Sequence, residues 1–300
     1  MPVNVVDTDR SASRLRAPLT AVNRRLSTIA AGRAWWGFAA FLALMAAWAI
    51  APDFFAPYDA ERLDPRNRLL GPFSDSTLGS HWAGTDSLGI DLFSQMVQGA
   101  RLTFYIAIVA TLLGTGIGVT LGMLAGYFGG FWDRLIMRLG EAQTAMPMFL
   151  VAILLLSLLG PSVTILIIVL PTLVWPIFAR VVRAETLQIK QATYIEAAVA
   201  TGCSTPAVLG RHVLPNVVPR ILVLFVVEIG HVMLAEAGLS FLGVGVQPPD
   251  ITWGLLIADG RPLLTVAWWL TILPGVLLSI TVLSLNILSR RFEQYAGAAA

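Results

Sequence analysis

The sequence predicts an all-α integral membrane protein with six transmembrane helices and both termini in the cytoplasm. Two observations predict this class: a composition poor in charge, and a series of apolar runs long enough to cross a bilayer. The chain is 56% hydrophobic and 13% charged, with a mean hydropathy of +0.75. A soluble domain carries about 25% charged residues. We therefore expect lipid, rather than water, to surround most of the chain.

The apolar runs give the expected spans, because a helix needs about 20 apolar residues to cross a bilayer. The run 142–179 has no charged residue and is too long for one span. We expect Gly160-Pro161-Ser162 to divide it into two helices joined by a tight turn. The six expected spans are 34–52, about 102–127, two within 142–179, 213–242 and 262–289.

Arginine and lysine residues indicate the orientation, since cytoplasmic loops are richer in them. With the N-terminus inside, the inside segments hold 15 of these residues and the outside segments hold five. The charged region before the first span is longer than that of a signal peptide, so we interpret this span as retained. The expected organisation is an Arg-rich cytoplasmic tail (1–33), a first transmembrane helix (34–52), an external segment (53–100), a five-helix transmembrane domain (101–291) with a cytoplasmic loop (193–216), and a C-terminal tail (292–300).

The common signatures of catalytic and metal sites are absent from the sequence. A P-loop needs a lysine followed by Ser or Thr, but the only lysine, Lys190, is followed by Gln191. The single cysteine, Cys203, excludes an internal disulfide, and the three histidines lack metal-ligand spacing. We expect no catalytic residue, metal or cofactor in this chain and no nucleic-acid partner; the lipid bilayer is its expected environment.

Four glycines recur every four residues in the second expected span: Gly114, Gly118, Gly122 and Gly126. This spacing places them on one helix face, where a second helix can approach closely. Scattered glycines are common in membrane helices, but the strict register favours a packing face.

Two carboxylates and a histidine lie inside the fifth expected span: Glu228, Glu236 and His231. Carboxylates inside a membrane are costly and are functional by default, so these residues are candidates for a polar translocation path. The alternatives are a buried Glu–His hydrogen bond within the bundle, or contact with water near the end of the span.

The cytoplasmic loop between spans four and five has strong local signals. Thr193 and Glu196 have the spacing of a capping box at a helix start. Gly202 is placed to end that helix in a left-handed turn. Thr205 is suited to the N-cap of a second helix, and Pro206 to its first position. We therefore expect two short, capped helices whose small residues let another surface approach.

The spacing of residues in this loop also follows a known pattern. Glu196-Ala197-Ala198 is followed by Gly202 six residues after the glutamate, and by Leu214-Pro215 twelve residues after the glycine. In this the chain resembles the EAA loop of binding-protein-dependent ABC importer permeases, except that His212 replaces the family's usual isoleucine. The resemblance implies that an ATPase docks on a loop comprising Thr193, Tyr194, Glu196, Ala197, Ala198, Gly202, Thr205, Pro206, His212, Leu214 and Pro215.

Further segments resemble the C-type permeases of the peptide/nickel branch of this family, over about residues 78–292. They are Gly84-Thr85-Asp86, Leu88-Gly89, Asp91, Gly99-Ala100-Arg101, Gly126-Tyr127-Phe128-Gly129-Gly130, Asp133, residues 235–243, Gln247-Pro248-Pro249, Trp253-Gly254 and Ala258-Asp259-Gly260-Arg261. One more position departs from the pattern, since Ile90 stands where an arginine is usual.

The resemblance implies a type I ABC importer permease fold and a non-catalytic subunit of the cytoplasmic (inner) membrane that moves short peptides by alternating access. The implied partners are a homologous second permease, two ATPase subunits that bind ATP and Mg, and an external solute-binding protein. One alternative is a non-peptide cargo, such as a metal chelate or glutathione. An ion-coupled secondary transporter is a further alternative, but it would leave the capped loop unexplained. An integral membrane enzyme is disfavoured because the sequence lacks catalytic motifs.

Overall fold

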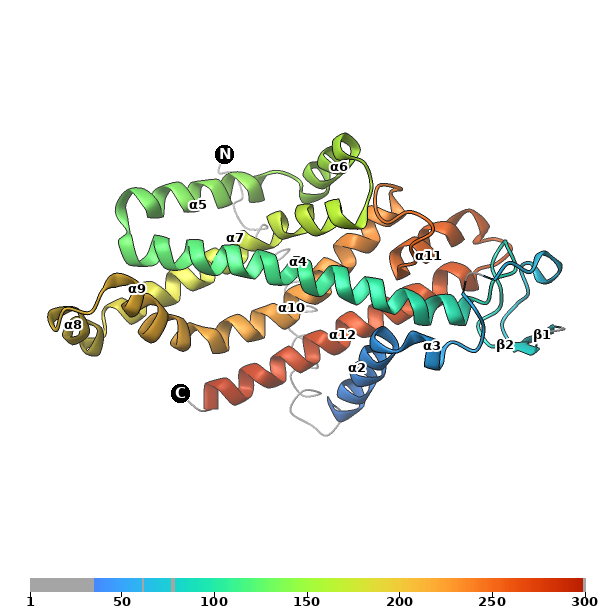
Figure 1. The fold of residues 1–300 in the computed structure, drawn as a ribbon, viewed down its shortest axis with the longest axis horizontal. Coiled ribbons are helices and arrows are strands. Elements are labelled where there is room, and N and C mark those ends of the chain that lie inside the picture. Colours follow the sequence, from blue (N-terminus) through green and yellow to red (C-terminus); the bar gives the residue numbers. More distant parts are fainter. Residues whose placement is uncertain (1–34, 61, 77–78, 299–300) are drawn as a thin grey trace, which may run out of the picture.

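A computed structural model describes residues 35–60, 62–76 and 79–298. The predicted Arg-rich tail and the last two residues lie outside the described part. The described chain is predominantly helical, as the sequence predicts, with one small β-hairpin (Figure 1).

The elements of the first half are α2 (Trp35–Ile50), α3 (Pro52–Phe55), the 3-10 turn η1 (Pro65–Asn67), strands β1 (Ser74–Ser76) and β2 (Gly79–His81), α4 (Leu92–Phe128) and α5 (Gly130–Ala145). They are followed by α6 (Met148–Leu159), α7 (Val163–Lys190), α8 (Thr193–Ala200), α9 (Thr205–Val208), the π-helix η2 (Leu209–Val213), α10 (Leu214–Phe241), α11 (Trp253–Gly260), the 3-10 turn η3 (Arg261–Leu263) and α12 (Trp269–Ala298). The strands are antiparallel, with Ser74 opposite His81 and Ser76 opposite Gly79.

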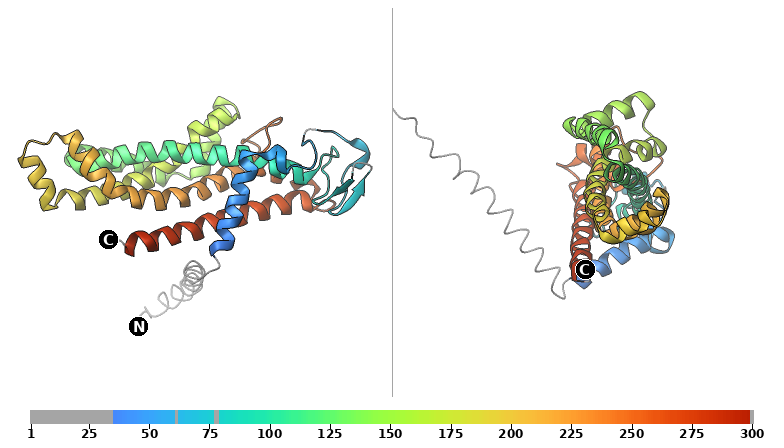
Figure 2. Two further views of the ribbon diagram at one scale, coloured as in Figure 1. Left: turned by 60° about the horizontal axis from the view of Figure 1, so that its bottom comes forward. Right: turned by 90° about the vertical axis from the view of Figure 1, so that its left-hand side faces the viewer.

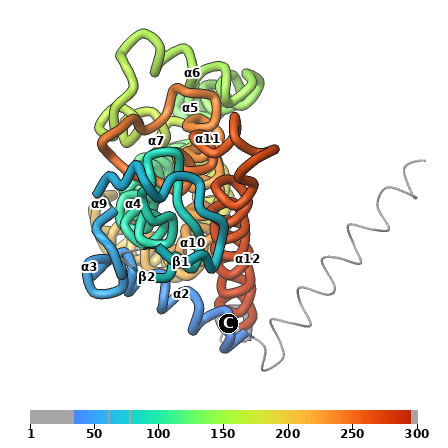
Figure 3. Tube along the Cα trace, turned by 90° about the vertical axis from the view of Figure 1, so that its right-hand side faces the viewer, coloured from blue at the N-terminus to red at the C-terminus, as the bar shows by residue number. Residues whose placement is uncertain are grey.

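Four long helices, α4, α7, α10 and α12, run along the longest axis of the molecule (Figure 1). The short helices α8 and α9 lie at one end of this bundle, and β1 and β2 lie at the other (Figure 2). Viewed from the hairpin end, α6 projects from one side of the bundle and α2 lies on the opposite side (Figure 3). Buried apolar side chains of the long helices, such as Ile106, Phe178, Met233 and Leu278, form one continuous core.

Four helices in the described part of the chain are long and apolar enough to span a membrane. They are α4, α7, the continuous helical segment 205–241 and residues 269–294 of α12. A fifth span results if α5 and α6, which meet at 88°, are counted together. The described part of α2 is apolar and has 16 residues, where a span needs about 20. Of the six expected spans, four are therefore long helices and one is a bent pair.

Helix α4 begins ten residues before the predicted start at residue 102. The side chain of Asp91 caps it, because Asp91 Oδ2 accepts hydrogen bonds from the Ser94 amide and from Ser94 Oγ, each at 2.8 Å. The other oxygen, Oδ1, lies 2.8 Å from Nδ1 of buried His81. Arg101 is therefore inside the helix, and residues 92–100 of the predicted external segment are helical.

The third expected span is not a straight helix. The chain bends between α5 and α6 at Met146 and Pro147. A residue before proline is disfavoured in the helical region, and Met146 has the extended conformation (φ −85°, ψ 139°). Helix α6 has 12 residues and ends at Gly160 (φ +86°), which makes the predicted turn before α7.

The ends of the last two spans also differ from the predicted ends. The second loop helix, α9, continues through η2 into α10 without a break, so no loop separates it from the membrane helix. Helix α12 starts at Trp269 rather than at residue 262, because η3 and a short connection occupy 261–268. It runs on to Ala298, so most of the predicted C-terminal tail is helical.

The glycine face of α4 lies directly against α7. A Cβ atom built on Gly114 would lie 2.8 Å from Val174 Cβ, and one on Gly118 would lie 2.6 Å from the Trp175 carbonyl oxygen. At Gly122 and Gly126 the nearest atoms are the Ala179 oxygen and Thr186 Cβ, each at 2.7 Å. These distances leave no room for a side chain, so the four glycines set the spacing of the two helices.

We predict that Gly118→Leu weakens the packing of α4 on α7, because its Cβ would meet backbone atoms that cannot move aside. Overpacking of this kind costs about 1–3 kcal/mol. The expected result is a lower thermal unfolding temperature of the purified protein in detergent. Gly116→Leu is the matched control, since nothing lies within 4 Å of a Cβ at that position. Equal stability of the two variants would contradict the prediction.

Candidate functional site

The loop formed by α8 and α9 lies at the end of the bundle farthest from the β-hairpin (Figure 1). Gly202 joins its two helices and has φ +86°, the left-handed conformation expected from the sequence. The Gly202 amide donates to the Val199 oxygen and the Cys203 amide to the Ala198 oxygen, both at 3.0 Å. This pair of bonds is a Schellman motif, which satisfies the last carbonyl groups of α8.

The predicted side-chain caps are not present. The N-cap of α8 is Ala192 and that of α9 is Ser204, and neither makes a side-chain capping bond. Thr193 and Thr205 are instead the first helical residues, so Pro206 follows one position later than predicted. The Ala192 carbonyl oxygen accepts from the amides of Ile195 (2.9 Å) and Glu196 (3.3 Å). The turn after α7 is therefore closed by backbone bonds, which leaves Glu196 free of a capping role.

One side of the loop is anchored in the bundle and the other is open. Ile195, Val208 and Val213 are fully or almost fully buried. Tyr194 is 49% exposed, and Glu196, Ala197, Gly202, Pro206 and Pro215 are exposed as well. Ala198, Thr205, His212 and Leu214 lie between these extremes. The exposed residues form a surface of small and polar groups that faces away from the bundle.

His212, the residue that departs from the family pattern, lies in the π-helix η2. The Leu214 amide donates to the Leu209 oxygen five residues earlier. The His212 ring lies 6.3 Å from the Tyr194 ring, centroid to centroid. This contact joins the first helix of the loop to the helical segment that leads into α10. Periodicity does not reveal such a π-turn, which is a local irregularity often found at functional sites.

The three candidate residues of the polar translocation path, all on α10, form two separate groups. Glu228 Oε1 lies 3.1 Å from His231 Nδ1, and the His231 side chain is 56% exposed. Glu236 is fully buried, and its Oε1 accepts from Ser240 Oγ (2.7 Å) and Thr252 Oγ1 (3.0 Å). Thr252 in turn caps α11. Glu236 thus joins α10 to α11, whereas buried Glu228 and exposed His231 pair with each other within α10.

Helix α11 is fastened to α4 by Trp253, a contact that the sequence does not indicate. The indole Nε1 donates to the Met96 carbonyl oxygen at 2.8 Å, and the Trp253 amide donates to Thr103 Oγ1 at 3.0 Å. Trp253 is fully buried. The end of the bundle opposite the loop is therefore closed by a helix packed across α4 and α10.

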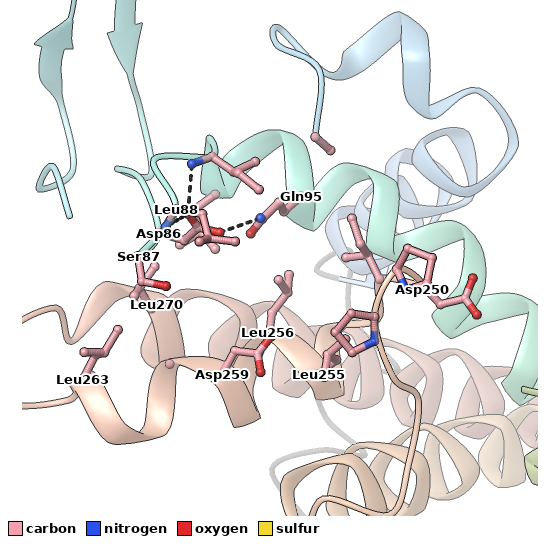
Figure 4. Close-up of a pocket in the computed structure, with 17 residues that line it drawn as sticks. Asp86, Ser87, Leu88, Gln95, Asp250, Leu255, Leu256, Asp259, Leu263 and Leu270 are labelled. Atoms are coloured by element: carbon pink, nitrogen blue, oxygen red, sulfur yellow. Dashed lines mark hydrogen bonds between the residues drawn. The ribbon is translucent and has the colours of Figure 1, made fainter. Parts of the chain in front are cut away.

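A cavity of about 430 Å³ lies at this closed end, between the start of α4 and α11 (Figure 4). Asp86 lines it and accepts hydrogen bonds from the amides of Leu88 (2.8 Å) and Ile90 (2.9 Å) and from Gln95 Nε2 (2.9 Å). Asp259 lines it from α11. Burial, and secondly the charge of Asp86, raise the pKa of the Asp259 carboxyl above its ordinary value.

Residues 118–296 match the family model described as the binding-protein-dependent transport system inner membrane component. The chain belongs to this family. The match covers most of the glycine face, the loop and all later helices. The protein is thus a permease subunit of an ABC importer of the peptide/nickel branch, and a multi-pass protein of the inner membrane.

Several relatives of the permease carry the name glutathione transport system permease protein GsiD. The chain is 39% identical over 249 residues to the one from Pectobacterium atrosepticum, which covers 83% of this chain and 81% of the relative. It is 40% identical over 251 residues to that of Escherichia coli O6:K15:H31, and 41% over 251 residues to that of Shigella dysenteriae serotype 1, with the same coverage.

We predict that Gly202→Ala loosens the end of α8, because a left-handed conformation costs an L-residue about 1–2 kcal/mol. Hydrogen exchange of the amides around Gly202, including that of Cys203, should become faster. Gly202→Asn should change exchange less, since Asn tolerates this conformation. Gly210→Ala is the control, because Gly210 is helical and a Cβ built on it has no neighbour within 4 Å. Unchanged exchange in Gly202→Ala would refute the prediction.

We also predict that Asp259→Asn stabilises the permease at neutral pH. A carboxyl whose pKa is raised in the folded state loses stability as pH rises through that pKa. Asparagine does not ionise, so at neutral pH the variant should unfold at a higher temperature than the unsubstituted protein. This difference in unfolding temperature should shrink as the pH falls toward about 4, near the ordinary pKa of Asp. An advantage that stays constant or grows at low pH would contradict this account.

Proposed function

We propose that this permease moves short peptides across the inner membrane by alternating access, driven by ATPase subunits that dock on the loop 193–216. The observation that carries the proposal is the loop itself. It is a two-helix unit, closed by backbone hydrogen bonds at Gly202 and exposed at the end of the bundle. Such a unit can transmit a rigid-body displacement into α7 and α10, between which it lies.

The proposed cargo class rests on the relatives. Those described above are named as glutathione permeases. Glutathione is one of the alternative cargoes that the sequence leaves open, and the names of these relatives favour that alternative. We propose short di- and oligopeptides as the cargo class, with glutathione as its alternative.

The proposed assembly contains a homologous second permease, two ATPase subunits and an external solute-binding protein. ATP and Mg would bind to the ATPase subunits, and this chain would contribute no catalytic residue. The β-hairpin end of the bundle, opposite the loop, would face the solute-binding protein (Figure 1).

The cargo is tested by purifying the partner solute-binding protein and identifying its natural ligand by mass spectrometry. We expect a di- to tetrapeptide or glutathione, and we expect the same compound to drive uptake into vesicles that contain the complete complex. A metal chelate or another non-peptide ligand, with no uptake of peptides or glutathione, would overturn the proposed cargo while leaving the ABC permease assignment intact.

We predict that Glu196→Ala reduces cargo-stimulated ATP hydrolysis and uptake while the complex still inserts in the membrane. A loss of about tenfold corresponds to about 1.4 kcal/mol of coupling. Gly202→Pro should have a larger effect, because proline cannot adopt a positive φ. Glu293→Ala is the control, since Glu293 is also exposed but lies on α12. Normal uptake by Gly202→Pro would rule out coupling through this loop.

A further inference from the structure

A proline in the middle of α7 leaves a backbone carbonyl without its helical partner. Pro176 has no amide hydrogen, so it cannot donate to the carbonyl oxygen of Thr172 four residues earlier. In the hydrocarbon region no water replaces the missing donor, and an unpaired backbone group there is strongly destabilising. This carbonyl therefore needs a donor from another part of the chain.

Gln143, near the end of α5, supplies that donor. Its Nε2 donates to the Thr172 oxygen, and its Oε1 accepts from Trp175 Nε1 at 2.8 Å. The same part of α5 approaches Pro176 at a second point, because a Cβ on Gly140 would be 3.5 Å from Pro176 Cβ. The amide nitrogen and the amide oxygen of Gln143 thus both bind α7, at the position where Pro176 interrupts its backbone hydrogen bonds.

Helix α5 is fastened to α7 at its other end as well. Arg183 forms a two-pronged ion pair with Asp133, with Nη2 of the arginine 2.7 Å from Oδ2 of the aspartate. Arg183 lies two turns before the end of α7 at Lys190, and the loop begins with α8 after a two-residue connection. A displacement of the loop therefore reaches α5 through two polar contacts.

The bend between α5 and α6 follows Gln143 by three residues. Met146 is 59% exposed in the bend, and Phe149, just after it, packs against Gly238 of α10. Non-helical backbone at membrane depth is tolerated only against protein or a water-filled cavity. The bend is accordingly packed on this chain at Phe149 and exposed at Met146.

We propose that Gln143 is a positioning residue for transport, which ties the α5–α6 bend to the turn of α7 at Pro176 so that the bend follows the displacement of α7 and the loop. This inference rests on the proposed function. It adds Gln143 as the residue through which a displacement of the loop reaches the α5–α6 bend. Gln143 itself touches neither cargo nor nucleotide.

The test uses Gln143→Leu in the complete complex in lipid nanodiscs and vesicles, with Cys203 replaced by serine. Spin labels at Leu154 on α6 and Leu112 on α4, both exposed, report the distance between the bend and the α4–α7 pair without nucleotide and with trapped ATP. We expect the distance to change with ATP in the unsubstituted protein and to stay fixed or broaden in Gln143→Leu. Uptake should fall about tenfold, as expected when a buried carbonyl loses its donor, with basal ATP hydrolysis unchanged.

Thr144→Val is the matched control, because the Thr144 hydroxyl bonds only to carbonyls of its own helix turn. Trp175→Phe serves as a second variant if Gln143→Leu fails to assemble; it removes one hydrogen bond to Gln143 and should reduce uptake and the distance change in part. A normal ATP-dependent distance change with normal uptake in the variant that assembles would overturn the inference. If the unsubstituted complex itself shows no ATP-dependent uptake, the proposed function fails instead.

Discussion

The close approach of α4 and α7 is the constraint on which the rest of the structure depends. At four successive turns of α4 a glycine faces α7, and any larger residue would collide with it. Membrane helices have no hydrophobic driving force between them, so backbone approach and van der Waals contact hold such pairs together. Helix α7 thereby has a fixed place beside α4, and the elements fastened to α7 are positioned by it.

Helix α7 connects the exposed loop to the interior of the bundle. Its end leads through two residues into α8, and Gln143 donates to the Thr172 carbonyl that Pro176 leaves without a helical donor. The loop keeps its shape through backbone bonds at Gly202 rather than through side-chain caps. Exposed side chains such as Tyr194 and Glu196 are therefore available to another surface. In the proposed transport cycle ATP is hydrolysed in other subunits. The continuous connection from the loop through α7 would carry their movement to the interior of the bundle.

Features with one local cause were predictable from the sequence. The glycine repeat indicates a packing face, and Gly202 indicates a left-handed turn. Features that depend on distant partners were not, and two local signals were missed because the predicted spans followed hydropathy. The early start of α4 needs Asp91, and its Asp-x-x-Ser capping signal was available but lay outside the apolar run. The bend at Pro147 lies in a run without charged residues. The hydropathy of that run predicts a membrane span, and the proline within it was not taken as a break. The Gln143 contact joins residues 29 apart and has no sequence signature.

The central claim is that the loop 193–216 is the surface on which the ATPase subunits dock. Photo-crosslinking from position 194 tests it most directly, with a benzophenone amino acid in place of Tyr194 in intact membranes. The same probe at Phe73, 81% exposed near the β-hairpin, is the control for the opposite end. The account predicts crosslinks to a nucleotide-binding subunit from position 194 and none from position 73. Crosslinks to that subunit from position 73 alone, or from neither position in an active complex, would contradict it.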